Sequence, residues 1–423
     1  MTSKPIPTEA FVWVWLPHAQ QAVVAGRLVQ QGRQLLFNYG RSYLARSDAM
    51  ALYLPELPLQ AGSLPLSVGL NMPACIRDAS PDAWGRRVLI NRMMSQADQG
   101  SGLLVLDELS CLLLSGSNRI GALDFQASAE HYEARDAQQA TLEELQTAAD
   151  KVERGSPLPP ALNQALLHGT SIGGARPKVM LSDALHQRIA KFASSSDVYS
   201  VVKAEFVAMR LAQRTGLQVA PVALTTALGK DVLLVERFDR ERQGAHWQRK
   251  AMVSALTLLG LDEMMVAYAS YEQLAEVVRH RFAEPEDSLQ ELFGRMVFNL
   301  LCGNTDDHAR NHAAFWDGQT LRLTPAYDIC PQQRSGEEAS QGMLIHGKDR
   351  RSRLSVCLQA ASAFLLDTRK AQRIIDRQVE VIKQDWDAVC DEASLSEVDR
   401  RYLWGRQFLN PFVFQGQGRG EYG

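Results

Sequence analysis

The chain has 423 residues, of which 46% are hydrophobic and 22% are charged, and its formal net charge is −3. These values place it among ordinary soluble globular proteins that are large enough for a substantial core and two to three domains. Because 45 basic residues are balanced by 48 acidic ones, the composition argues against a broad basic surface for nucleic acid.

Neither a leader peptide nor a membrane span is expected. The first residues lack an apolar segment behind their single lysine, which argues against a signal peptide. Apolar runs such as 11–16 and 232–235 are far too short to cross a bilayer. The six cysteines are scattered without a Cys-x-x-Cys pair, which predicts free thiols in a reducing compartment. We therefore expect a cytoplasmic protein.

The first part of the chain is predicted to be rich in β-structure. Strands are expected over residues 11–16, 22–28, 34–39 and 50–54, and prolines mark breaks between these segments. A helix is then expected with Ser80 as its N-cap and Pro81 in its first turn. A second helix is predicted over 103–114, and a strand follows residues 118–123. The polar segment near residues 128–140 predicts an approximate domain boundary.

A glycine-rich segment precedes two predicted strands that carry lysines. Residues 168–181 read His-Gly-Thr-Ser-Ile-Gly-Gly-Ala-Arg-Pro-Lys-Val-Met-Leu, and a second strand covers 187–192. Glycines let backbone N–H groups approach phosphate oxygens, and Lys178 or Lys191 could add positive charge. The motif is neither G-x-G-x-x-G nor a Walker A sequence, so a plain turn is the alternative interpretation.

Lys191 lies near the end of its strand and is followed by a predicted helix over 200–214 that carries Glu205. In protein kinases, a strand lysine paired with a helix glutamate orients the α- and β-phosphates of ATP. The alternative is that the two are unrelated surface charges. The apolar strand 232–235 leads to Glu236 and Phe238, where the backbone could meet the edge of an adenine ring. From there to the end, the chain is predicted to be mainly helical.

The most informative stretch is Leu301–Asn311. An amphipathic helix over 289–301 leads into it, with its apolar residues at helical spacing. Gly303 then occupies the position expected of a helix C-terminal cap. A polar loop follows, and after it residues 313–323 form two short β-like runs around Asp-Gly, which predicts a hairpin. Tyr327-Asp328 comes soon after.

This order of parts predicts phosphoryl transfer. Protein kinases place a catalytic Asp in a loop, an Asn five positions later and a metal-holding Asp downstream. Asp306, Asn311 and Asp328 have this spacing. One carboxylate would orient the attacking hydroxyl, while the amide oxygen and the second carboxylate would hold Mg²⁺. Two alternatives stay open: an ordinary polar loop, and a transition-metal site that uses His308, His312 and Asp306.

Taken together, these motifs resemble the HipA family of bacterial toxin serine/threonine kinases. The matching segments are residues 171–178, 189–192, 235–240, 304–311 and 327–328. Residues 78–87 and 119–123 look like the N-terminal subdomain of that family. The resemblance runs from about residue 10 to about 350, and beyond that the chain is similar only in being helical.

The resemblance implies an α+β, kinase-like fold with two lobes. A β-rich N-terminal subdomain is expected over residues 1–132, a small lobe with the glycine-rich loop over 133–240, and a mainly helical C-terminal lobe with the catalytic loop over 241–423.

The resemblance also implies a serine/threonine protein kinase that uses ATP and Mg²⁺. Asp306 would be the catalytic base or hydroxyl-orienting residue with His308 beside it, and Asn311 and Asp328 would hold the metal. The residues implied to bind the nucleotide are Ser171, Gly173, Gly174, Ala175, Lys178, Lys191, Glu205, Glu236 and Phe238.

The family further implies regulation and partners. Ser171 matches the serine that family members autophosphorylate. A phosphate there would add about −1.5 to −2 charges to a loop built to receive ATP phosphates, which should switch the enzyme off. Expected partners are a helix-turn-helix antitoxin, operator DNA through that antitoxin, and a protein substrate such as an aminoacyl-tRNA synthetase, whose phosphorylation induces dormancy. The alternative is a kinase-fold protein without catalysis that serves the antitoxin as a co-repressor.

Overall fold

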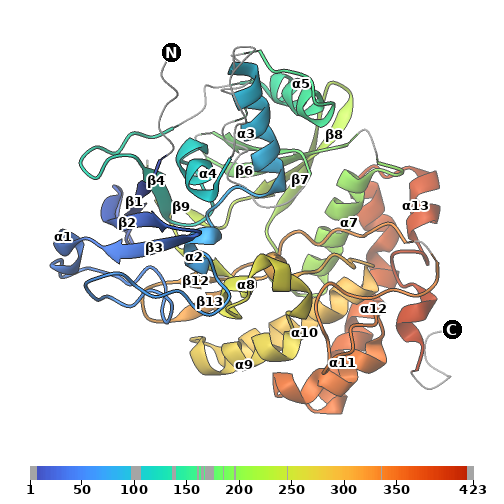
Figure 1. The fold of residues 1–423 in the computed structure, drawn as a ribbon. Coiled ribbons are helices and arrows are strands. Elements are labelled where there is room, and N and C mark those ends of the chain that lie inside the picture. The colour runs from blue at the N-terminus through green and yellow to red at the C-terminus, as the bar shows by residue number, and fades with distance from the viewer. Residues whose placement is uncertain are drawn as a thin grey trace. The chain divides into compact units, whose positions relative to one another are not determined.

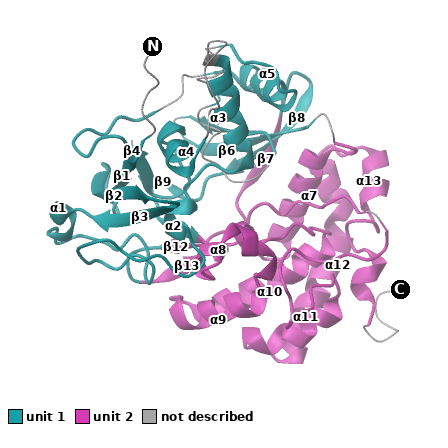
Figure 2. Cartoon of the chain, viewed as in Figure 1, with its two compact units in different colours: residues 1–195, 226–253, 316–319 teal, residues 196–225, 254–315, 320–423 magenta. Residues whose placement is uncertain are grey.

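The computed structural model divides the chain into two compact units (Figure 2). Unit 1 comprises residues 1–195, 226–253 and 316–319, and unit 2 comprises residues 196–225, 254–315 and 320–423. The structure describes residues 7–96, 106–135, 140–159, 162, 166, 176–183, 185–194, 197–244, 246–334 and 336–416. Most strands belong to unit 1 and most long helices to unit 2. Figure 1 labels these elements along the chain. The predicted three-part division at residues 132 and 240 stays a prediction.

The first sheet of unit 1 is antiparallel and has the order β3-β2-β1-β4. Its strands are β1 (Glu9–Val14), β2 (Val23–Gln31), β3 (Gln34–Tyr39) and β4 (Leu123–Gln126). They confirm the predicted strands near 11–16, 22–28 and 34–39. The strand predicted over 50–54 is wrong, because tyrosine hydroxyls satisfy that backbone instead. Tyr43 donates to the Met50 carbonyl at 2.7 Å, and the Leu52 N–H donates to the Tyr39 hydroxyl at 2.8 Å.

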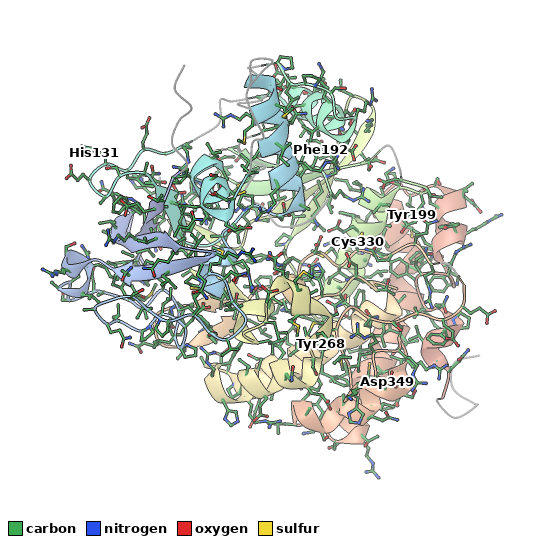
Figure 3. All side chains as sticks on the ribbon, in the orientation of Figure 1. His131, Phe192, Tyr199, Tyr268, Cys330 and Asp349 are labelled. Atoms are coloured by element: carbon green, nitrogen blue, oxygen red, sulfur yellow. The ribbon has the colours of Figure 1, made fainter. Side chains whose placement is uncertain are left out.

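The second sheet of unit 1 carries the predicted lysine strands. The strands β5 (Lys178–Ser182), β6 (Gln187–Phe192) and β8 (Lys230–Glu236) pair in that order, antiparallel. Lys178 lies opposite Lys191 in the register. The helices α3 (Ala83–Gln96) and α5 (Leu142–Glu153) contribute Trp84 and other apolar side chains to a buried cluster with Phe192, which Figure 3 labels.

Local capping decides where the helices of unit 1 begin. The predicted cap at Ser80 is wrong: α3 begins at Ala83, and the Asp82 carboxylate accepts a hydrogen bond from the Gly85 N–H at 3.0 Å. Helix α4 (Glu108–Leu114) is capped by Asp107, which accepts from Ser110 N at 2.7 Å. Residues 103–105 of the helix predicted over 103–114 lie outside the described residues. Two one-turn helices, α1 (Arg41–Leu44) and α2 (Ala74–Arg77), complete this part.

Buried arginines fix a loop of the N-terminal region to the segment after β8. Asp239 is 2% exposed and accepts from the Gly121 N–H at 2.7 Å. Arg237 and Arg240 bond this carboxylate at 2.6 and 2.8 Å, and they donate to the Arg119 carbonyl at 2.8 and 2.6 Å. Burial alone would raise the pKa of Asp239, but the two guanidinium groups hold that pKa well below its usual range.

The segment after β8 also contains strands where helix was predicted. Strands β9 (Arg240–Gln243) and β10 (His246–Arg249) form an antiparallel hairpin, and β11 (Met252–Ser254) follows. The Arg249 guanidinium stacks on the Trp15 ring at 3.5 Å from its centroid. The expectation that the chain is helical from residue 241, apart from the later hairpin, is therefore wrong for these residues.

Unit 2 is built around α10 (Pro285–Leu301). The apolar stripe predicted over 289–301 is confirmed, since each of its members is at most 1% exposed: Leu289, Leu292, Phe293, Met296, Val297, Leu300 and Leu301. The surrounding elements are α7 (Val201–Arg214), α8 (Ala255–Leu258), η2 (Glu263–Tyr268), α9 (Tyr271–Arg281), α11 (Leu354–Ala360), η4 (Ala361–Phe364), α12 (Thr368–Glu392), α13 (Glu397–Leu403) and η5 (Pro411–Phe414).

The predicted hairpin after the polar loop is also confirmed. It consists of β12 (Ala313–Trp316) and β13 (Leu321–Leu323). Strand β7 (Val222–Ala227) leads from unit 2 into unit 1. Among the described residues, no helix combines the length and the apolar character needed to cross a bilayer.

Replacing the buried Asp239 by alanine should destabilise the protein by about 3–5 kcal/mol, because two buried guanidinium groups lose their counter-charge. Urea unfolding monitored by circular dichroism measures this loss. The matched control is Glu241→Ala, whose exposed ion pair with Lys250 should contribute less than about 1 kcal/mol. The Asp239 contribution should be present at neutral pH and lost as the pH falls through the lowered pKa. Equal effects of both substitutions would contradict this account.

Candidate active site

The polar loop after α10 starts with a sharp reversal of the chain. We refer to residues 303–312 as the acidic loop. Gly303 has φ +72°, a backbone conformation that residues with a side chain rarely adopt. A Cβ at this position would also lie 2.8 Å from the Gln407 carbonyl oxygen, so there is no space for a side chain. Asn304 then turns back: its N–H donates to the Asn299 carbonyl at 2.9 Å, and its side-chain amide donates to Asn299 Oδ1 at 3.1 Å. The end of α10 thus sets the start of the loop.

Two consecutive aspartates of the loop have opposite environments. Asp306 is exposed, whereas Asp307 is 1% exposed. The Asn311 amide donates to the Asp306 carbonyl at 3.3 Å, and the Asn311 N–H donates to the His308 carbonyl at 2.8 Å within η3 (Ala309–Asn311). Asp306, half-buried His308 and buried Asn311 therefore share one short turn.

The buried carboxylate of Asp307 anchors this turn. The Tyr271 hydroxyl, from the start of α9, donates to Asp307 Oδ2. His312 Nε2 lies 2.8 Å from Asp307 Oδ1 and 3.1 Å from the Tyr271 oxygen. Tyr271 is 0% and His312 3% exposed, so the three groups form a closed polar triangle inside unit 2. Burial and the Asp307 charge raise the pKa of Tyr271 well above its usual range, which keeps the hydroxyl a donor.

The triangle determines which tautomer His312 adopts. Asp307 can only accept hydrogen bonds when ionised, so Nε2 carries the hydrogen. His312 Nδ1 is buried without a hydrogen-bond partner. No group of three His, Cys, Asp or Glu among the described residues is placed to hold a metal, so the alternative metal site of His308, His312 and Asp306 is wrong.

Asp328 belongs to a second segment that lies beside the acidic loop. It has φ +58°, in the left-handed region that Asp tolerates better than branched residues. The Asn304 amide donates to its carbonyl at 3.4 Å, and the neighbouring Tyr327 hydroxyl donates to the Arg310 carbonyl at 2.7 Å. These bonds fix the Asp328 segment beside the acidic loop. The segment continues past Cys330 to Pro331, whose carbonyl accepts from Tyr199 at 2.8 Å; Figure 3 labels Tyr199 and Cys330.

Asp306 and Asp328 influence each other electrostatically. Loss of surrounding water raises the pKa of Asp306 above its usual range, the charges of Asp328 and Asp307 raise it further, and His308 opposes the change. Two nearby carboxylates with an amide oxygen are the hard donors that Mg²⁺ prefers. A cation would relieve the repulsion between Asp306 and Asp328, so Asp306, Asn311 and Asp328 fit a magnesium site.

The other predicted site residues are distributed over both units. Lys178 and Lys191 are 2% and 8% exposed on β5 and β6 in unit 1, and Glu205 is 2% exposed on α7 in unit 2. The Glu236 carboxylate at the end of β8 accepts from Arg188 Nε at 3.1 Å, and half-buried Phe238 follows. Ser171, Gly173, Gly174 and Ala175 lie outside the described residues.

Three residues that shape the site were not predicted in that role. The sequence motifs assign no role to Asp307, and they indicate His312 only as a metal ligand. Tyr271 had no local signal at all, because it lies 36 residues before Asp307. The histidine five positions after Asp307 was the available signal, because a carboxylate and an imidazole this close in a loop can form a hydrogen bond.

Models of known families match most of the chain. A model described as the HipA-like C-terminal domain matches residues 170–386, and one described as the HipA N-terminal domain matches residues 16–126. Y4mE of Sinorhizobium fredii is 34% identical over 131 residues, 30% of this chain and 31% of that protein. The serine/threonine-protein kinase toxin HipA of Shewanella oneidensis is 30% identical over 145 residues, 30% of this chain and 33% of that protein. The chain thus spans about a third of the length of these two relatives.

A solved structure has a similar fold. It contains HipA of Shewanella oneidensis MR-1 with HipB and its operator DNA, and the TM-score is 0.68 at 18% identity. The similarity covers 96% of this chain and 99% of that chain. At this identity the likeness shows the fold, and it confirms the predicted α+β fold with two lobes.

Asp306→Asn should stabilise the protein at neutral pH, because it removes a charge that has lost surrounding water and that is repelled by Asp328 and Asp307. Since the side chain is largely exposed, the gain should be less than about 1 kcal/mol. The gain should shrink as the pH falls through the raised pKa of Asp306, where the wild-type carboxylate becomes neutral. Asp307→Asn, one residue away, should instead cost about 2–3 kcal/mol, because a charged acceptor of buried hydrogen bonds is lost. Urea unfolding at several pH values measures both. A destabilised Asp306→Asn variant at neutral pH would contradict the repulsion.

Proposed function

Because the chain belongs to the HipA family, we propose that it is a serine/threonine protein kinase that transfers the γ-phosphate of ATP to a protein hydroxyl. The observation that carries this proposal is the meeting of Asp306, Asn311 and the Asp328 segment in unit 2. Phosphoryl transfer requires positioning and charge neutralisation more than covalent chemistry by the protein. These residues supply an exposed carboxylate for the hydroxyl and hard oxygen ligands for a metal ion.

Asp306 acts on the accepting hydroxyl. Its carboxylate is exposed to an incoming substrate, while its backbone is held by the Asn311 amide. A carboxylate with a raised pKa is a better proton acceptor than an ordinary aspartate, because its pKa lies closer to the working pH. His308 lies in the same turn and lowers the pKa of Asp306 by its proximity, so it limits this effect.

Asn311 and Asp328 hold Mg²⁺. When bound, the ion neutralises charge on the phosphate oxygens of ATP. The contributions of the chain are the two oxygen donors and the bonds that keep them in place, from Asn304 to the Asp328 carbonyl and from Tyr327 to the Arg310 carbonyl.

The proposed contacts to the nucleotide come first from β6 in unit 1. Lys191, on β6 opposite Lys178, contacts the phosphates, as the strand lysine does in other kinases. The side chain of Glu236 is occupied by Arg188, so the backbone near Glu236 and Phe238 is what meets the adenine edge. Ser171, Gly173, Gly174 and Ala175 supply the loop over the phosphates.

The biological role that we propose is that of a toxin in a toxin–antitoxin pair. The similar solved structure contains HipB and operator DNA, which supports a DNA-binding antitoxin as the partner of this chain. The protein substrate belongs to the cell's translation machinery, with aminoacyl-tRNA synthetases as the first candidates, and its phosphorylation produces dormancy and persistence.

Asp306→Ala or Asp328→Ala should lower phosphate transfer at least about 100-fold, because each substitution removes a group that acts in the transition state. Transfer from labelled ATP in the presence of Mg²⁺ to cellular proteins measures this. Asp376→Ala, which removes an exposed carboxylate from α12, should retain full activity. If wild type and Asp306→Ala do not differ while the operator is bound tightly, the co-repressor alternative replaces the kinase.

Ser171→Ala should prevent the protein from inactivating itself. Wild-type protein incubated with ATP and Mg²⁺ is expected to gain one phosphoryl group at Ser171 and to lose activity as it does so, because a phosphate adds about −1.5 to −2 charges beside the nucleotide phosphates. Intact-mass spectrometry and activity over time measure both changes. Label on another residue, or a Ser171→Ala variant that loses activity at the wild-type rate, would contradict this role.

A further inference from the structure

A short helix before α9 exposes large apolar side chains to solvent. None of the six residues of η2 (Glu263–Tyr268) is buried, and Met264, Met265 and Tyr268 are 87%, 43% and 60% exposed. Figure 3 labels Tyr268. 3₁₀ helices longer than three or four residues are uncommon. A 3₁₀ helix of six residues without a buried face therefore calls for an explanation. Clustered exposed apolar side chains commonly mark interaction sites.

The first turn of η2 is fixed to the acidic loop. The Asp262 carboxylate caps the helix and accepts from Met264 N at 2.7 Å. Glu263 accepts a charge-assisted hydrogen bond from Arg310, which lies between Asp306 and Asn311 in the loop. Met264 is therefore the residue directly after Glu263, which contacts the loop that carries the proposed catalytic aspartate.

The last turn of η2 is fixed to the same loop by a second route. The Arg350 guanidinium donates to the Ala267 carbonyl and lies 3.5 Å from the Gly342 carbonyl. Gly342 in turn packs on the acidic loop so closely that a Cβ there would lie 2.7 Å from the Asp307 carbonyl oxygen. Tyr271, which bonds Asp307, follows η2 directly in the chain. Both ends of η2 are thus positioned relative to Asp306.

We propose that Met264, Met265 and Tyr268 form a docking platform for the polypeptide substrate, which binds a large apolar side chain close to the serine or threonine that accepts the phosphate. The proposal rests on the proposed kinase function and names the substrate feature that it recognises. Methionine adapts its shape to different partners, and tyrosine and methionine are enriched in protein interfaces.

The charges around the platform favour an apolar ligand over a charged one. The Asp262 carboxylate is used in the helix cap, and Glu263 and Arg310 neutralise each other. The Arg350 guanidinium is directed at backbone carbonyls. What the platform offers a partner is therefore mainly the thioethers and the aromatic ring. Its direct attachment to the acidic loop favours the segment that delivers the hydroxyl as its occupant.

The test uses the full chain and a peptide library in which residues around a fixed serine or threonine are varied. Wild type is expected to prefer large apolar residues at one or two positions near the hydroxyl. The double variant Met264→Ser/Tyr268→Ser should raise KM for the preferred peptide about tenfold, the effect of losing roughly one interface anchor, with kcat and the KM for ATP unchanged. Val398→Ser, which removes an equally exposed side chain on α13, is the matched control and should leave all three constants unchanged.

The outcomes separate this proposal from the kinase function itself. If wild type phosphorylates peptides but the double variant keeps the wild-type KM and selectivity, the platform is overturned and the kinase function stands. If wild type transfers phosphate to no peptide and no protein, both are overturned. A change in oligomeric state of the double variant, measured by analytical ultracentrifugation, would show that a second copy of the chain covers these residues and would also overturn the proposal.

Discussion

The candidate site depends on one buried carboxylate. Asp307 lies inside unit 2 and accepts hydrogen bonds from Tyr271 and His312, so a charge that is costly to bury is stabilised by two donors. Because Asp307 points inward, the adjacent Asp306 faces solvent. The geometry that we assign to catalysis is therefore a consequence of how its neighbour is buried, and the same contact ties the loop to α9.

Helix α10 supplies the fixed end from which this loop starts. Its apolar stripe is fully buried, and its last turn presents Asn299 to Asn304. The bonds from Asn304 to the Asp328 carbonyl and from Tyr327 to the Arg310 carbonyl then bring a segment from beyond the hairpin to the same place. Local charge repulsion around Asp306 is the cost of this arrangement, and it is the kind of cost that functional sites commonly carry.

The sequence predicted those parts that follow from short-range patterns. Helical periodicity identified α10, and the spacing of Asp306, Asn311 and Asp328 identified the residues that the structure brings together. The Tyr271–Asp307–His312 triangle depends on contacts 36 and 41 residues apart, which no local pattern reports. The β9–β10 hairpin was missed because its strands lack alternating apolar residues. Asp82 rather than Ser80 lies at the start of α3, where its carboxylate accepts from the Gly85 N–H. The division into three domains remains a prediction.

The central claim is that Asn311 and Asp328 hold one divalent ion next to Asp306. The most direct measurement replaces Mg²⁺ with Mn²⁺ and counts bound ions by electron paramagnetic resonance in the presence of a non-hydrolysable ATP analogue. Wild type should bind Mn²⁺ tightly together with the nucleotide, and Asp328→Asn should lose that binding while remaining folded. Undiminished Mn²⁺ binding in the folded Asp328→Asn variant would contradict the account.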